Sequence, residues 1–209
     1  MQNGFPYLDI LIFGVIAIFL IFRLKNILGT KTGFEENSLN KNNQPNQYSN
    51  VVSLKSNDEN TINSQIDKII KVDPNFNEVD FLNGSKNFFE MVLTSFVSGD
   101  LDNIKNFIKP SVLKSFKIAI DDRNKENETL VIDLKSFKRQ EISKTEINKS
   151  SIKINVVFET LQIKALVDQN ENIIDGDMNK EIIVKDEWIF ERKIKQESPN
   201  WTLIETKSM

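Results

Sequence analysis

The chain has 209 residues, contains neither cysteine nor histidine, and carries a formal net charge of −3 at pH 7. These absences exclude disulfides, thiolate nucleophiles and cysteine-based metal sites, and they remove the commonest general base near neutral pH. The slightly acidic balance gives no bulk electrostatic reason to expect nucleic acid as a partner. We therefore expect no nucleic-acid partner, no metal and no cofactor.

The first feature along the chain is an apolar run over residues 5–22, interrupted only by Asp9. As a helix, a run of this length would extend about 27 Å, close to a hydrocarbon core of about 30 Å. We predict a transmembrane helix inside an anchor and juxtamembrane segment covering residues 1–34. A secretory signal peptide is less favoured because no basic residue precedes the run and no A-x-A motif follows it. A buried helix of a soluble domain is less favoured because the run is apolar on every side.

The charges that flank this run predict its orientation. Arg23, Lys25 and Lys31 follow the run, whereas only the α-amino group and Asp9 lie at its other end. Lysine and arginine accumulate on the cytoplasmic side of a membrane helix. We therefore predict a single-pass protein of the inner (cytoplasmic) membrane, with its N-terminus outside and its C-terminal domain in the cytoplasm, or in the matrix if the host is an organelle.

Residues 35–60 are rich in Asn, Gln and Ser and show no sustained hydrophobic period. Such a segment cannot bury enough apolar area to offset the entropy lost on ordering. We interpret it as a disordered polar linker. The remaining residues, 61–209, are long enough to form one domain of common size.

Helical spacing dominates the first half of this domain. An amphipathic helix is predicted from Thr61 to the break at Asp73-Pro74, followed by a long helix over residues 77–97 with an aromatic stripe. Gly99 and Asp100 favour a C-cap followed by a new N-cap. Shorter helices are expected over residues 101–108 and 110–127.

After residue 127 the apolar period becomes two, which predicts strands over residues 129–137, 141–147, 151–168, 180–194 and 201–206. In the third of these strands, the inward positions change from Phe158 to Leu161 and Ile163. This change of phase predicts a bulge near Glu159–Thr160 that would curve the sheet. The expected fold class is α+β, with helices packed on the concave face of a curved antiparallel sheet.

Two candidate sites follow from these patterns. Asp186 shares a strand face with Val184 and Trp188. It could serve as a base if burial raised its pKa, although pairing with Arg123, Arg139 or Arg192 is the favoured reading. A set of apolar side chains either lines a pocket for an acyl chain or an apolar peptide side chain, or forms plain core. The set consists of Phe88, Phe89, Val92, Phe96, Phe158, Trp188 and Phe190.

Three stretches together resemble a known family. They are DPNFNEVDFLNGSKNFFEMVLTSFVSGDLDNIKNFIKPSVLKSFKIAIDDR, DEWIFERKI and SPNWTLIET, and they resemble the Tim44-like domain. The N-terminal run and Thr32-Gly33-Phe34-Glu35 are similar to membrane-anchored bacterial relatives. The resemblance implies a cone like that of nuclear-transport-factor-two folds, with an apolar cavity, and association with membrane or lipid.

The mitochondrial member of this family is an inner-membrane import translocase subunit that anchors the import motor. It carries a long segment ahead of the domain, where this chain has only the Asn-rich linker, so motor recruitment is not carried over residue by residue. The resemblance implies a non-enzymatic, membrane-anchored scaffold. Its expected partners are inner-membrane lipid and translocon, chaperone or ribosome components, in protein translocation or membrane-protein biogenesis. The alternatives are a tethered lipid or small-molecule module, including an isomerase-type enzyme, and a secreted domain.

Overall fold

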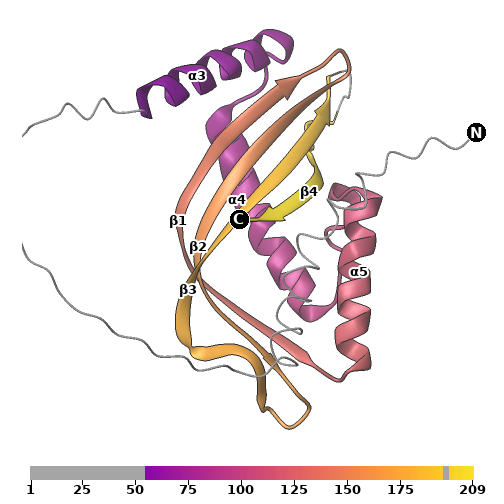
Figure 1. Ribbon diagram of the computed structural model, residues 1–209. Helices are drawn as coiled ribbons and strands as arrows, with labels where there is room; N and C mark the ends of the chain where they lie inside the picture. The colour runs from indigo at the N-terminus through magenta and orange to yellow at the C-terminus, as the bar shows by residue number, and fades with distance from the viewer. Residues whose placement is uncertain (1–54, 195–197) are drawn as a thin grey trace, which may run out of the picture.

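The computed structural model describes residues 55–194 and 198–209 (Figure 1). The predicted transmembrane helix, and the predicted linker up to residue 54, lie outside the described residues. Within those ranges, no helix is both long enough and apolar enough to cross a bilayer.

The helices come first, as expected. They are α3 (Lys55–Val72), α4 (Glu78–Ser98), the 3-10 helix η1 (Lys105–Phe107) and α5 (Pro110–Lys125). Helix α3 begins earlier than the predicted start at Thr61, and its first turns therefore fall inside the segment predicted as a linker. Its Ile66 and Ile69 are buried against the domain, and such packing supplies most of the stability of a helix in a protein. The helix predicted over residues 101–108 is only the short η1.

Local chemistry fixes both ends of α4. The Asn77 side chain accepts a hydrogen bond of 3.0 Å from the backbone N–H of Asp80, which makes Asn77 the N-cap. Gly99 ends the helix with φ of 80°, a left-handed conformation that glycine adopts without steric cost.

The strands β1 (Thr129–Ile147), β2 (Ser151–Val167), β3 (Ile173–Lys193) and β4 (Thr202–Ser208) form one antiparallel sheet in the order β1-β2-β3-β4. The two strands predicted over residues 129–137 and 141–147 are the single strand β1. Figure 1 shows the sheet curving around the helices, with α4 and α5 on its concave side. The α+β prediction is confirmed.

The predicted bulge lies in the neighbouring strand rather than in β2. Strands β2 and β3 remain in register from Ser151 to Ile163, whereas β1 skips Lys138 between the pairs Phe137–Thr160 and Arg139–Glu159. Strand β1 is at the edge of the sheet, where an extra residue disturbs only one ladder. Strand β2 therefore keeps its alternation.

Because β2 alternates without interruption, Thr160 and Gln162 share the concave face with Phe158. The expectation that Leu161 and Ile163 would point inward is wrong. Thr160 is 0% exposed and Gln162 is 1% exposed, and Gln162 donates a 2.7 Å hydrogen bond to the Thr160 hydroxyl. This half of the concave face is thus polar where the sequence pattern predicted aliphatic side chains.

The core lies between α4 and the concave face. The ring of Phe89 lies 4.7 Å from that of Phe158 and 4.6 Å from that of Trp188, between centroids. Gln140 of β1 ties the helix to the sheet by donating to the Leu82 carbonyl and the Ser85 hydroxyl, at 2.6 and 2.9 Å. The buried side chains that make up this core also include Phe81, Val92, Ile104, Phe116, Ile142, Ile152, Ile154, Val156, Phe190 and Leu203.

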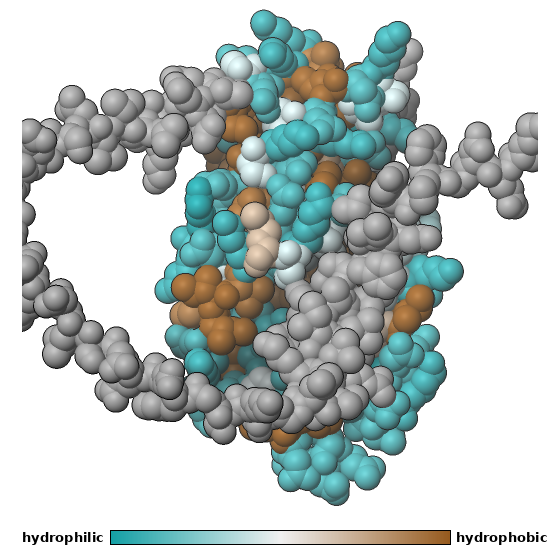
Figure 2. All heavy atoms as spheres, in the orientation of Figure 1, coloured by the Kyte–Doolittle hydropathy of each residue, from teal (hydrophilic) through white to brown (hydrophobic). Residues whose placement is uncertain are grey.

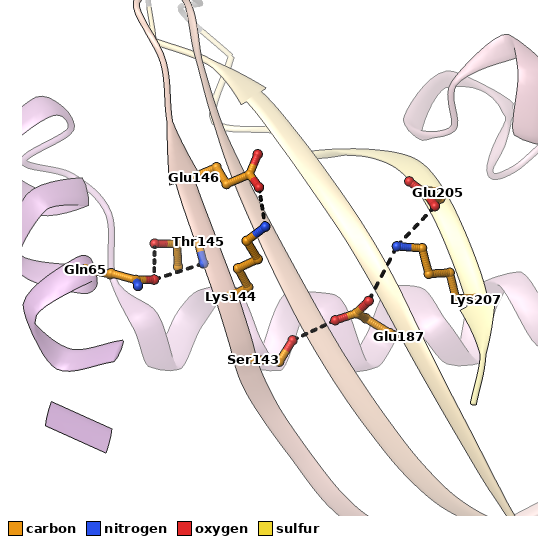
Figure 3. Close-up of polar contacts among 8 residues, drawn as sticks. All are labelled: Gln65, Ser143, Lys144, Thr145, Glu146, Glu187, Glu205 and Lys207. Atoms are coloured by element: carbon orange, nitrogen blue, oxygen red, sulfur yellow. Dashed lines mark hydrogen bonds and ion pairs between the residues drawn. The ribbon is translucent and has the colours of Figure 1, made fainter. Parts of the chain in front are cut away.

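The opposite face of the sheet carries charged and polar side chains beside the buried Val157 and Ile189. Figure 3 shows Ser143 donating to Glu187, and Lys207 placed between Glu187 and Glu205 across β3 and β4. Lys144 pairs with Glu146 on the same face.

Candidate binding pocket

An aromatic pocket of about 420 Å³ opens where the start of α4, η1 and the adjoining ends of β3 and β4 converge. Phe81 contributes its ring from the first turn of α4, with its centroid 4.9 Å from that of Trp201 and 5.8 Å from that of Phe190. Phe88, two turns further along α4, lies 6.3 Å from Phe190 and 6.2 Å from Phe107 of η1. The rings surround the opening from α4, η1, β3 and the residue just before β4, an arrangement suited to an apolar group.

A largely buried ion pair holds one wall of the pocket in place. Arg192 of β3 pairs with Asp73, the residue just after α3, and both side chains are only 13% exposed. The guanidinium also lies 5.2 Å from the centroid of the Trp201 ring, within cation–π range. Burial lowers the pKa of Arg192, because desolvation disfavours the charged form. The pair therefore links α3, β3 and the chain entering β4.

The floor and rim of the pocket are small and polar. Gly84 of α4 faces the opening, and a Cβ added there would meet no heavy atom within 4 Å. The amide side chains of Asn75, Asn77 and Asn200 stand at the rim. An apolar cavity with convergent amides at its mouth can bind an apolar side chain or acyl chain while hydrogen-bonding the polar group next to it.

Of the seven side chains predicted to line a pocket, only Phe88 and Phe190 line this one. Phe89, Phe158 and Trp188 form the aromatic centre of the core, beside Val92, which is 2% exposed. Phe96 packs on Phe116 instead, with ring centroids 5.4 Å apart. The seven residues are therefore divided between pocket and core.

Sequence reasoning did not assign Phe76, Phe81, Phe107, Arg192 or Trp201 to the pocket. Phe81, Arg192 and Trp201 belong to stretches that carry the family resemblance, and this was the available signal. Phe76 and Phe107 belong to the first of these stretches as well. Phe76 lies between α3 and α4 and Phe107 ends the three-residue η1, and neither segment is long enough to show a hydrophobic period.

Asp186 does not pair with an arginine. Arg123 donates to the carbonyls of Phe96 and Val97, Arg139 binds Glu141, and Arg192 binds Asp73. The favoured pairing expectation is thus wrong, because each of the three guanidinium groups is bound to another partner.

Asp186 instead accepts a hydrogen bond from Ser208 on the concave face. Desolvation by burial raises the pKa of Asp186, against the opposing effects of the Ser208 hydroxyl and the positive charge of Lys164. Burial likewise lowers the pKa of Lys164, opposed by the charges of Asp186 and Asp175. Asp186 and Lys164 are therefore two partly buried, oppositely charged groups on the polar half of the concave face.

A second groove, of about 860 Å³, runs between α4 and the first half of β1. Charged side chains line much of it, and Lys86 lies 4.8 Å from the centroid of the Phe137 ring. In residues 55–194 and 198–209, no three His, Cys, Asp or Glu side chains gather where they could hold a metal ion.

Comparison with known proteins identifies the family. The model of the Tim44-like domain matches residues 62–208, well over half of the chain, and the chain therefore belongs to this family. Among solved structures, the intermembrane space region of the chloroplast protein ARC6 matches with 10% identity and a TM-score of 0.46, covering 65% of this chain and 98% of that one. Comparison with curated proteins gives no match.

Proposed function

We propose that this protein is a membrane-anchored, non-enzymatic docking module that holds protein partners at the cytoplasmic face of the inner membrane, in protein translocation or membrane-protein biogenesis. The observation that carries the proposal is the Tim44-like domain over residues 62–208, preceded in the same chain by an apolar run with a basic flank. A domain placed beside a membrane by a tether meets partners there at a raised effective concentration. Translocon, chaperone and ribosome components are the expected partners.

In this proposal the aromatic pocket is the point of contact. We take the cavity that the family resemblance implies to be the space among Phe81, Phe88, Phe190 and Trp201, which line the aromatic pocket. A large apolar side chain of a partner would fill it, and the amides of Asn77 and Asn200 would hydrogen-bond the partner's backbone beside that side chain. Buried aromatic contacts of this kind supply most of the affinity of many interfaces.

The test is crosslinking in living cells from a photoreactive residue at Asn200, on the pocket rim, in the full-length chain. Crosslinked proteins of the translocation or membrane-insertion machinery are expected. Gly84→Trp, which places an indole in the opening, should remove those adducts, whereas Gly84→Ala should retain them because one methyl group leaves the pocket open. Equal adducts from both variants would refute the role of the pocket.

A second candidate is a tethered module that binds an acyl chain or another apolar small molecule, and the size and aromatic lining of the pocket favour it. It predicts a bound lipid in native mass spectra of the detergent-solubilised full-length protein. That lipid should be lost in Gly84→Trp and kept in Gly84→Ala. Lipid adducts without protein crosslinks would favour this second candidate over the first.

The anchor and its orientation have their own test. Full-length protein should remain in the membrane fraction after alkaline extraction. Protease added to spheroplasts should leave the C-terminal domain intact, whereas protease added to inverted vesicles should digest it. Domain cleavage in spheroplasts would instead place the domain outside the cell, as for a secreted domain.

A further inference from the structure

The mouth of the aromatic pocket carries a negative charge. Two charged residues, Asp80 and Arg192, line the pocket. Arg192 is paired with Asp73, and this pair leaves no net charge. Asp80 is exposed, and no lysine or arginine of the described residues lies within ion-pair distance of it. The carboxylate of Asp80 is therefore open to a ligand that enters the pocket.

Local structure fixes the position of this carboxylate. Asp80 is the third residue of α4, and its N–H donates the 3.0 Å hydrogen bond to the Asn77 side chain. The next residue, Phe81, is 7% exposed, and its ring packs against those of Trp201 and Phe190. Consecutive residues of a helix point about 100° apart. The ring of Phe81 therefore lines the interior of the pocket, while the carboxylate of Asp80 stands at its mouth.

The aromatic lining favours the same sign of charge in a ligand. The faces of aromatic rings carry partial negative charge and attract cations. Arg192 already lies 5.2 Å from the centroid of the Trp201 ring, so this cluster holds one cation. A carboxylate or phosphate at the mouth would instead be repelled by Asp80. Six aromatic side chains line the pocket, namely Phe76, Phe81, Phe88, Phe107, Phe190 and Trp201.

We propose that the pocket selects a cationic amphipathic segment of a protein partner, in which a large apolar side chain fills the cavity and an adjacent lysine or arginine pairs with Asp80. This inference rests on the proposed docking function and adds the chemistry of the partner. The amides of Asn77 and Asn200 would bind the backbone between the two side chains. Because an exposed ion pair is weak, the pairing with Asp80 contributes selectivity between partners more than affinity.

A second exposed apolar surface lacks this preference for one sign of charge. Figure 2 shows apolar side chains gathered over the bend of β3, where Ile182 and Ile183 are 38% and 63% exposed. Glu181 precedes this pair of isoleucines and Lys185 follows shortly after it, so both signs of charge stand beside the surface. Charge therefore does not specify a partner there, whereas it does at the pocket.

Three blocked tripeptides test the preference on the full-length chain, solubilised in an uncharged maltoside detergent. They are N-acetylated and C-amidated Lys-Phe-Lys, Gln-Phe-Gln and Glu-Phe-Glu, which share the ring and differ in the flanking charge. Trp201 fluorescence reports binding, because Trp201 lines the pocket whereas Trp188 lies in the core. The lysine peptide should bind about threefold more tightly than the glutamine peptide, which should bind about threefold more tightly than the glutamate peptide.

Variants and salt assign this preference to Asp80. Asp80→Asn should give the three peptides similar affinities. Glu90→Gln is the matched control and should keep the order, because Glu90 is an exposed carboxylate of the same helix that does not line the pocket. In the wild type, raising the salt concentration from about 20 mM to about 0.5 M should reduce the preference, since exposed charges are screened. Gly84→Phe, which fills the opening, should abolish binding of all three peptides.

Equal affinities for the lysine and glutamine peptides, or a lysine preference that persists in Asp80→Asn, would overturn the inference and leave the docking function standing. Binding of none of the tripeptides would also overturn it. The docking function has its own readout in that case, which is the crosslinking from residue 200.

Discussion

The Ser208 hydroxyl donates a hydrogen bond of 2.9 Å to Oδ1 of Asp186, and so joins the end of β4 to a carboxyl group on the concave face of the sheet. Burial raises the pKa of this carboxyl above its usual value, and the Ser208 bond opposes that rise. The folded protein therefore holds the Asp186 proton more tightly than the unfolded chain does. The stability contribution of Asp186 must then fall as the pH rises from the unfolded pKa through the raised folded pKa.

Asp186→Asn should remove this pH dependence. Relative to the wild type, the variant should gain stability as the pH rises from the unfolded pKa of about 4 through the raised folded pKa, since the amide has no charge to desolvate. Urea unfolding followed by tryptophan fluorescence reports on the domain, because Trp188 and Trp201 are the only tryptophans. Asp121→Asn, at an exposed position, is the matched control for the loss of one carboxyl group. Parallel profiles for wild type and Asp186→Asn would contradict the prediction.

Lys164→Met should raise the pKa of Asp186 further, because the positive charge of Lys164 opposes the effect of burial. The fall in stability that Asp186 causes should then extend to higher pH than in the wild type. NMR titration of the Asp186 carboxyl carbon in both proteins checks this directly. A carboxyl that titrates at the same pH in both would show that the two charges do not interact.

Arg123 stabilises the C-terminal end of α4. It is 5% exposed, and its Nη2 donates to the carbonyls of Phe96 and Val97, each at 3.1 Å. These carbonyls lack partners within the helix, and a cation at a helix C-terminus is favourable. Arg123→Met should lower the free energy of unfolding by about 2 kcal/mol. The surface change Lys125→Met should cost less than about 0.5 kcal/mol, as measured by urea unfolding.

Gly84→Ala should stabilise the protein by about 0.5–1 kcal/mol, because alanine favours a helix interior more than glycine and its Cβ has open space here. Gly99→Ala should do the opposite. Gly99 has φ of 80°, and an added Cβ would lie 3.3 Å from a methyl of Ile120. Thermal melting of the two variants gives the comparison, and destabilisation by Gly84→Ala would show that the pocket floor is closed.

Gln65 attaches α3 to the edge of the sheet. Its Oε1 accepts from the backbone N–H of Thr145 at 3.1 Å and from the Thr145 hydroxyl at 3.0 Å (Figure 3). Gln65→Ala should speed hydrogen exchange of the Thr145 amide and cost about 1 kcal/mol. Glu146→Ala, which removes only the exposed ion pair with Lys144, should leave that amide protected. Unchanged exchange in Gln65→Ala would show that α3 is held by packing alone.

The local parts of this fold were predictable from the sequence. The aromatic stripe at helical spacing, Gly99 at the end of α4 and the period of two after residue 127 fixed the order of helices and strands. Because the chain contains no cysteine and no histidine, disulfides, thiolate nucleophiles, cysteine-based metal sites and a histidine general base could be excluded from the sequence. These features depend on backbone dihedrals and side-chain direction along a single segment, which neighbouring residues determine.

Contacts between segments were decided only by the tertiary structure. The extra residue near Thr160 could sit in either of two paired strands, and its location in β1 turned Thr160 and Gln162 inward in place of Leu161 and Ile163. The pairing of Arg192 with Asp73, which are far apart in sequence, placed Trp201 and Phe81 around the pocket. Strand register depends on which residues of two distant segments are paired, and a single segment does not contain that information. An aromatic side chain can likewise fill the core or line a cavity, and the residues packed around it decide between the two.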